Sequence, residues 1–275
     1  MLYAAFLFVA GEAWQPEDAG TWLPLWLRAT GGFVLFNALS SGGYFLNDAA
    51  DAEADRGHPR KQHRPIAAGV IEARRARRVG FALLAGGTLA GLALGWPFAL
   101  AAAAYAATTV AYTVVLKRFL VIDALAVGIL FALRAVAGAF AVDVPPSVWL
   151  IVCTFTAAAF VGYVKRGQEV RLLGAQAAAH RGTLAMPARL LDRLVLASGL
   201  VTVGLYTAYA LTAPNLPPLK MLVTVPFVAY GLHRYHALAR ETPERDADEL
   251  VLRDPVLIAT VSWFLIVAVA LLTFG

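Results

Sequence analysis

Long apolar runs dominate the 275-residue sequence and constrain its fold more than any other feature. Eight of them cover approximately residues 22–47, 73–95, 97–117, 120–141, 147–164, 190–213, 217–239 and 253–274. A helix needs roughly 20 mostly apolar residues to cross a bilayer, and each run is about that long. The runs are continuous, whereas the strands of a transmembrane β-barrel alternate apolar and polar residues. The sequence therefore predicts an all-α, polytopic transmembrane helical bundle.

A shorter apolar run occupies residues 1–10 and reaches only about half the length needed to cross a bilayer. We interpret it as a truncated first helix, which brings the expected number of helices to about nine. A secretory signal peptide is the alternative, although no basic residues precede the run. Because no second domain is indicated, we expect a single transmembrane domain over residues 1–275.

The basic residues follow the membrane topology. Most of the 23 Lys and Arg residues fall in alternate connections between the apolar runs, and cytoplasmic loops of membrane proteins are enriched in these residues. We therefore predict a cytoplasmic N-terminus and a location in the cell (plasma) membrane. The same pattern explains the net charge of +5, so the charge does not indicate a nucleic-acid partner.

An acidic stretch, NDAADAEAD at residues 47–55, follows the first long run directly. If the helix continues, Asp48, Asp51 and Asp55 share one face through i+3 and i+4 steps. Three carboxylates repel one another, and a helix C-terminus disfavours anions. A Mg²⁺ ion would relieve both conflicts, since it prefers carboxylate and phosphate oxygens. We therefore predict these three aspartates as catalytic metal ligands at a diphosphate site; the alternative is a solvated acidic helix end.

The acidic stretch is followed by a dense basic segment with two prolines. Its members are Arg56, His58, Arg60, Lys61, His63 and Arg64. Pro59 and Pro65 predict a loop that folds back instead of a continued helix. Because Arg and Lys side chains suit phosphate oxygens, we expect Lys61 and Arg64 to bind a substrate phosphate. Some of the basic residues are also expected to contact anionic membrane lipids.

These motifs carry a family resemblance. The run NDAADAEADRGHPRKQHRPIAAG at residues 47–69 resembles the first signature of the UbiA superfamily of membrane prenyltransferases, which is NDxxDxxxD followed by basic residues and RPI. The segment YTVVLKR at residues 112–118 is similar to the YxxxLKR segment of the same family. The resemblance implies a nine-helix UbiA fold, Mg²⁺ as cofactor and a cytoplasmic active site. It also implies substrate-binding roles for Asn47, Tyr112, Lys117 and Arg118.

One departure from the family pattern points to a particular branch. Typical members carry a second acidic motif, DxxxD, at the end of the sixth helix, whereas residues 163–169 here read YVKRGQE. Lys165 and Arg166 replace the first acid, and Glu169 remains. This resembles the KRxxE pattern of decaprenyl-phosphate phosphoribosyltransferases, as does LVLRDP at residues 250–255. That branch uses phosphoribosyl diphosphate as donor and polyprenyl phosphate as acceptor, which implies that these three side chains bind substrate.

Two other functions remain open at the level of sequence. One is an aromatic prenyltransferase of the same superfamily, which would join a polyprenyl diphosphate to a hydroxybenzoate or naphthoate acceptor; the missing second acidic motif opposes it. The other is a transporter with a cytoplasmic divalent-cation site. The gathering of the acids at one membrane face opposes the transporter, since transporters place polar residues near the bilayer midplane.

Two features lie inside the apolar runs. Arg134 falls within the run 120–141, where a central arginine costs about 2.5–3.5 kcal/mol to insert. It is expected either to face a polar cavity as a substrate ligand or to pair with Asp123 or a backbone carbonyl. A stripe of glycines spaced by four, at residues 87, 91 and 95, predicts close packing along one helix face.

Overall fold

The computed structural model describes residues 18–59, 61–173, 188–212, 219–243, 245 and 247–274. All regular structure in these ranges is helical, so the all-α prediction is confirmed. The apolar run at residues 1–10 lies outside the described residues, and the side of the membrane on which the N-terminus lies stays a prediction. The chain forms two compact units, residues 1–151 and 152–275, which are described separately.

Several helices are long and apolar enough to cross a membrane. Within the residues that the structure describes, five meet this criterion by length and composition: Ala73–Leu94, Trp96–Val114, Leu120–Ala141, Val148–Leu173 and Arg189–Thr212. A further apolar helix, Pro255–Leu271, is shorter. These helices coincide with six of the eight predicted runs, and the remaining two runs also fall on helices.

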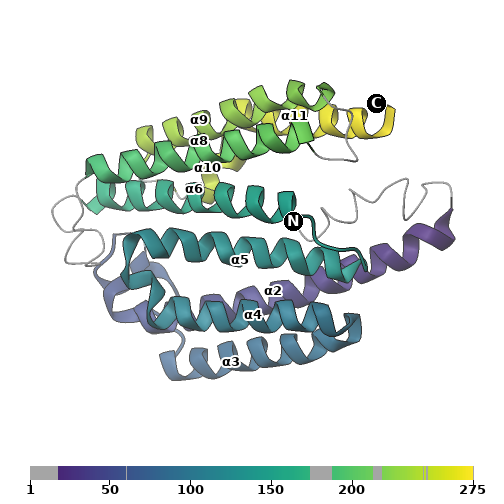
Figure 1. Cartoon of the computed structure of the whole chain (residues 1–275). Helices are drawn as coiled ribbons and strands as arrows, with labels where there is room; N and C mark the ends of the chain where they lie inside the picture. Colours follow the sequence, from purple (N-terminus) through teal and green to yellow (C-terminus); the bar gives the residue numbers. More distant parts are fainter. Residues whose placement is uncertain are drawn as a thin grey trace. The chain divides into compact units, whose positions relative to one another are not determined.

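In its described residues, the first unit packs four α-helices together, and α2 (Ala19–Arg56) contacts each of the other three (Figure 1). These three are α3 (Ala73–Ala90), α4 (Trp96–Val114) and α5 (Leu120–Ala141). Short 3-10 turns connect them: η1 (Lys61–His63), η2 (Gly91–Leu94) and η3 (Leu116–Arg118). Their shared core contains Phe36, whose ring meets Phe98 and Tyr105 edge-on at centroid distances of 5.7 and 5.2 Å. Edge-to-face contacts of this kind add to the stabilisation from burial.

Helix α2 extends well past its predicted membrane run. It begins after Asp18, whose carboxylate accepts a hydrogen bond of 2.9 Å from the backbone N–H of Gly20 and so caps the helix. Beyond residue 47 it continues through the alanine-rich acidic stretch, and alanine is the strongest helix former. It ends only at Arg56, followed by Gly57. The predicted continuation of the helix through the three aspartates is confirmed.

A tight glycine seam joins α2 to α3. A Cβ atom on Gly42 would lie 2.8 Å from the carbonyl oxygen of Gly80, and one on Gly80 would lie 2.9 Å from that of Gly42. The predicted glycine stripe was wrong at two of its three positions, because α3 ends at Ala90: Gly91 begins η2, and Gly95 follows η2 with a φ of +116°. Gly87 does lie on the seam, since its Cβ would meet Leu39 at 3.0 Å. The seam fixes the acid-bearing half of α2 against its neighbour.

Arg28 binds the ends of two neighbouring segments of this unit. Its Nε donates a hydrogen bond of 2.8 Å to the carbonyl of Ala141, and its Nη2 donates one of 2.9 Å to that of Leu94. Carbonyls in the last turn of a helix lack intrahelical partners, and a basic side chain can satisfy them. The guanidinium therefore holds α2 to the C-terminal ends of α5 and η2.

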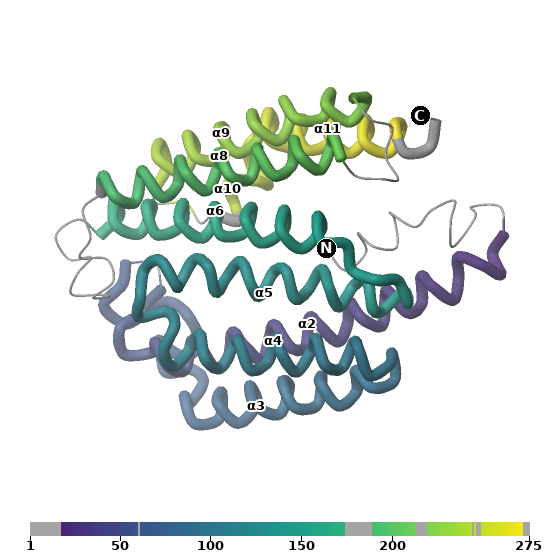
Figure 2. Tube along the Cα trace, viewed as in Figure 1, coloured from purple at the N-terminus to yellow at the C-terminus, as the bar shows by residue number. Residues whose placement is uncertain are grey.

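In its described residues, the second unit contains most of α6 (Val148–Leu173) and four further α-helices (Figure 2). These four are α8 (Ala188–Thr212), α9 (Val225–Glu241), α10 (Ala247–Arg253) and α11 (Pro255–Phe274). The Phe160 ring of α6 packs against the ring of Tyr235 on α9, with a centroid distance of 6.3 Å. An ion pair of 2.7 Å between Arg234 and Asp254 connects α9 to the start of α11, where Asp254 also accepts the N–H of Leu257.

Candidate functional site

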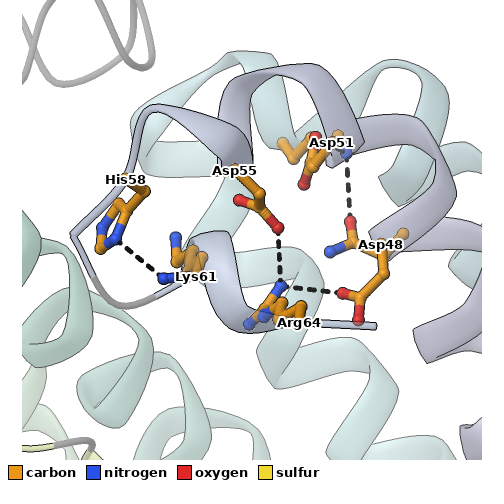
Figure 3. Close-up of polar contacts among 8 residues, drawn as sticks. Asp48, Asp51, Asp55, His58, Lys61 and Arg64 are labelled. Carbon is orange, nitrogen blue, oxygen red and sulfur yellow. Dashed lines mark hydrogen bonds and ion pairs between the residues drawn. The ribbon is translucent and has the colours of Figure 1, made fainter. Parts of the chain in front are cut away.

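Asp48, Asp51 and Asp55 project from one face at the C-terminal end of α2 (Figure 3). The side chains of Asp48 and Asp51 are 25% and 18% exposed, whereas that of Asp55 is 4% exposed. The three carboxylates thus differ in how easily a ligand reaches them. Asp48 and Asp51 are accessible, and Asp55 is enclosed by the chain.

The loop after α2 returns to this face and places a guanidinium on it. Arg64 Nη1 donates to Asp48 Oδ1 at 2.8 Å and to Asp55 Oδ2 at 3.1 Å (Figure 3). Buried Ile66 packs with Ala49 of α2 and Ala76 of α3, and this contact anchors the loop. The predicted fold-back is confirmed, and apolar packing two residues beyond Arg64 supports it.

A second cation reaches the same face from the connection between α4 and α5. Lys117 in η3 donates from Nζ to Asp51 Oδ1 at 2.5 Å and to Asn47 Oδ1 at 3.1 Å. The side chain of Lys117 is 10% exposed, so a low-dielectric surrounding strengthens its interaction with Asp51. Asn47 and Lys117 were both predicted as substrate ligands from their motifs, and the structure brings them into direct contact.

Six of the sequence-predicted residues make hydrogen bonds or ion pairs with one another at this face. The structure brings together Asn47, Asp48, Asp51, Asp55, Arg64 and Lys117. Lys61 lies half-buried in η1, Tyr112 is half-buried on α4, and Arg118 is exposed beside Lys117. All nine of these residues belong to the first unit.

The electrostatics of the face favour an additional cation. Burial raises the pKa of Asp48 above its ordinary value; the guanidinium of Arg64 lowers it, and the carboxylates of Asp55 and Asp51 raise it again. A raised pKa means that the environment disfavours the ionised carboxylate. A bound divalent cation would stabilise that ionised form.

The donor set fits a particular kind of metal site. Within the described ranges, no three His, Cys, Asp or Glu side chains are placed so that they could hold a metal ion by themselves. Mg²⁺ is usually bound by one or two carboxylates, with substrate phosphates and water completing its octahedron. The accessible oxygens of Asp48 and Asp51 suit this mode. They do not suit an ion enclosed by protein ligands alone.

The basic pair of α6 lies in the second unit. Lys165 is exposed, whereas Arg166 donates from Nη1 to Glu169 Oε2 at 2.6 Å in a pair whose side chains are 15% and 5% exposed. Residues three apart on a helix are neighbours, so the KRxxE spacing itself produces this pair. Glu169 therefore offsets the charge of Arg166, and the three residues together carry a net positive charge.

Arg134 lies on α5 in the first unit, and its partners are neutral. Nη2 donates to Ser40 Oγ at 2.8 Å and to the Tyr105 hydroxyl at 2.9 Å. The predicted alternative partner, Asp123, is eleven residues away on the same helix, about 16 Å along the axis, so the two side chains do not meet. The sequence reading missed Ser40 and Tyr105, although each is a polar residue within an apolar run.

Comparison with known proteins identifies the family. The profile of the UbiA prenyltransferase family matches residues 3–261. The chain belongs to the UbiA prenyltransferase family. Together with the apolar helices, membership makes this UbiA protein a multi-pass membrane protein.

Two relatives of known name resemble part of this UbiA chain. The decaprenyl-phosphate phosphoribosyltransferase of Mycolicibacterium smegmatis is 37% identical over 144 residues, which are 51% of this chain and 44% of the relative. Its counterpart from Mycobacterium tuberculosis is 37% identical over 153 residues, or 55% of this chain and 50% of the relative. The match thus spans about half the length of the curated relatives. The predicted resemblance to this branch is confirmed.

A solved structure has the same fold. The UbiA homolog from Archaeoglobus fulgidus bound to GPP and Mg²⁺ aligns with a TM-score of 0.72 over 99% of this chain and 94% of that one, at 17% sequence identity. At this identity the likeness concerns the fold, and the helical UbiA fold predicted from the motifs is confirmed.

Proposed function

We propose that this chain is a Mg²⁺-dependent transferase that moves a 5-phosphoribosyl group from phosphoribosyl diphosphate to a polyprenyl phosphate. The observation that carries the proposal is the face of α2, where accessible carboxylates and two cations lie together. Asp48 and Asp51 offer oxygen ligands, and Arg64 and Lys117 offer charges for phosphate. The names of the partial relatives support the same transferred group and a polyprenyl phosphate acceptor.

The three aspartates take different roles in this proposal. Asp48 and Asp51 hold the metal, since their side chains are the accessible ones. Asp55 is enclosed and bonded to Arg64, so it positions the guanidinium. A divalent metal, when bound, supplies charge stabilisation to the leaving diphosphate. The Mg²⁺ named with the solved UbiA homolog supports this choice of ion.

Other side chains of this unit bind the donor and its leaving group. The bond between the ribose anomeric carbon and the diphosphate oxygen breaks, and negative charge grows on the diphosphate. Arg64 and Lys61, on the loop after α2, bind its oxygens, because preorganised cations are most effective where charge develops. Asn47 and Lys117 hold Asp51 in place. No nucleophilic side chain is needed, since the acceptor phosphate is itself an anion and attacks the anomeric carbon.

The sequence of α6 favours this donor over a prenyl diphosphate. The second acidic motif of prenyl-transferring members is replaced by Lys165, Arg166 and Glu169, and Arg166 is already paired with Glu169. The motif therefore presents an exposed lysine and only one carboxylate, which is paired with Arg166. Phosphoribosyl diphosphate carries an additional phosphate monoester, and lysine and arginine suit such groups.

A donor competition tests the proposal directly. The purified chain is offered phosphoribosyl diphosphate with a polyprenyl phosphate, and separately a polyprenyl diphosphate with 4-hydroxybenzoate. We expect a polyprenyl phosphoribose from the first pair and no prenylated aromatic from the second. Asp48→Ala and Asp51→Ala should each abolish the transfer while the protein stays folded in detergent. The reverse choice of donor would replace the proposal with aromatic prenyl transfer.

The active site is proposed to face the cytoplasm of the cell membrane, where a soluble sugar phosphate is available. Glu53 lies on the same turns of α2 as the aspartates, and its side chain is 88% exposed. A Glu53→Cys variant, made with Cys153→Ser, should react with an impermeant maleimide in inside-out vesicles and stay unlabelled in right-side-out vesicles. Labelling only in right-side-out vesicles would contradict this orientation.

A further inference from the structure

Arg134 is the centre of a polar cluster inside the first unit, apart from the acidic face. It lies on α5, in a helix long and apolar enough to span a membrane. Its guanidinium bonds to Ser40 of α2 and to Tyr105 of α4. The guanidinium carbon also lies 5.1 Å from the centre of the Phe131 ring and 5.5 Å from that of Tyr105. Three helices thus converge on one positive charge.

The unused hydrogen-bonding groups of the guanidinium are all donors. Ser40 Oγ donates to the carbonyl of Phe36 at 2.6 Å and accepts from both Tyr105 and Arg134. The Tyr105 hydroxyl donates to Ser40 and accepts from Arg134. Arg134 Nε is buried and makes no hydrogen bond, and Nη1 makes none to the described part of the chain. A guanidinium has no acceptor, so a ligand of this cluster must bring acceptor atoms.

The positive charge of the cluster also favours a ligand with acceptor atoms, and in particular an anion. Among the residues that the structure describes, no carboxylate contacts Arg134; its partners are two hydroxyls and two rings. The rings offset part of a cation's desolvation cost, and hydroxyls carry no charge. A charge inside a membrane protein is expensive unless it is paired, and such residues usually mark substrate pathways. The residue is only partly buried.

We propose that Arg134, set in place by Ser40 and Tyr105, binds a phosphate monoester of a substrate. Ser40 precedes Asp48 by eight residues on α2, about 12 Å along the helix axis. The cluster therefore lies deeper in the unit than the face that holds the diphosphate. The 5-phosphate of the ribosyl donor and the phosphate of the lipid acceptor are both monoesters separate from that diphosphate. Because the ligand is a substrate of the transferase, the inference rests on the proposed function.

Binding of phosphate monoesters to the full-length chain in detergent tests the inference without catalysis. The probes are ribose 5-phosphate, farnesyl phosphate and, as an uncharged control, ribose. Arg134→Met keeps the length of the side chain and removes its charge. Since a charge-assisted hydrogen bond is worth about 10-fold to 100-fold in affinity, this variant should raise the Kd of at least one monoester about 30-fold. Arg134→Lys, which keeps the charge and loses the fork, should raise it about 10-fold.

Arg28→Met is the matched control. Arg28 is also a half-buried arginine of this unit, but its guanidinium is bonded to two backbone carbonyls. Its loss should lower stability and leave the Kd of both monoesters unchanged. If Arg134→Met does not fold, the Arg134→Lys measurement decides alone. An equal Kd for both monoesters in wild type and the Arg134 variants would overturn the inference.

The experiments distinguish the donor phosphate from the acceptor phosphate. They also distinguish failure of the role proposed for Arg134 from failure of the proposed transferase function. A loss confined to ribose 5-phosphate assigns Arg134 to the donor, and a loss confined to farnesyl phosphate assigns it to the acceptor. In the transfer assay, the KM of that substrate should rise more than kcat falls. Monoester binding that depends on Arg134 without phosphoribosyl transfer would refute the proposed function alone. Transfer without such dependence would refute only the role of Arg134.

Discussion

Replacing Gly80 by alanine tests whether the α2–α3 seam holds the acidic face in position. The added Cβ would lie 2.9 Å from the carbonyl oxygen of Gly42 and 2.9 Å from side-chain atoms of Leu46. Neither neighbour can move away cheaply. The first is backbone, and Leu46 is buried in the core only two residues before Asp48.

The expected loss of stability follows from comparing Gly80→Ala with Gly86→Ala, a substitution on the same helix. A Cβ atom on Gly86 would meet no neighbouring heavy atom within 4 Å, so Gly86→Ala projects into open space. Both substitutions gain the same helix propensity, about 1 kcal/mol, and this gain cancels in their difference. The overpacking at Gly80 remains, and such strain costs about 1–3 kcal/mol. Gly80→Ala should therefore be less stable than Gly86→Ala by that amount.

Unfolding of both variants in mixed micelles, titrated with sodium dodecyl sulfate, measures the difference in the free energy of unfolding. We also expect a higher KM for Mg²⁺ in Gly80→Ala, because α2 must shift near Asp48, and an unchanged one in Gly86→Ala. Equal stability of the two variants would refute the reasoning, since it would mean that the helices separate without cost.

Three further predictions concern other contacts. Arg28→Met frees the carbonyls of Ala141 and Leu94, so the free energy of unfolding should fall by about 1–2 kcal/mol; an unchanged thermal midpoint would contradict this. Lys117→Met leaves Asp51 without its bonded cation, so the free energy of unfolding measured in EDTA should fall by about 2 kcal/mol. Added Mg²⁺ should restore part of this loss. If Mg²⁺ does not change the stability of this variant, no metal binds there. EDTA alone should stop transfer with an unchanged helical circular-dichroism spectrum, whereas unfolding would show a structural metal.

Local patterns in the sequence were sufficient for the helices and for one face of the site. Hydrophobic runs located the helices, and the alanine-rich spacing of Asp48, Asp51 and Asp55 predicted a continuous helix with one acidic face. The two prolines predicted the return of the loop that carries Arg64. Each of these inferences depends on residues near one another in the chain, where periodicity and backbone preference decide the outcome.

Contacts between distant residues could not be predicted in this way. Lys117 meets Asp51 across 66 positions, and Arg28 meets Ala141 across 113. The glycine stripe on α3 was wrong at Gly91 and Gly95, because nothing local shows that the helix gives way to a 3-10 turn after Ala90. The i+3 pair of Arg166 with Glu169 was predictable from spacing. The family pattern implies substrate binding for the same two residues and does not itself indicate the pair.

The central claim is that Asp48 and Asp51 hold a divalent ion that contacts a diphosphate. Electron paramagnetic resonance of Mn²⁺ bound to the detergent-purified chain with inorganic diphosphate tests it most directly. We predict one bound ion with hyperfine coupling to ³¹P, lost in the Asp48→Asn Asp51→Asn double variant and retained in Glu53→Gln, whose side chain is exposed. Equal Mn²⁺ binding in the double variant, or bound Mn²⁺ without ³¹P coupling, would contradict the account.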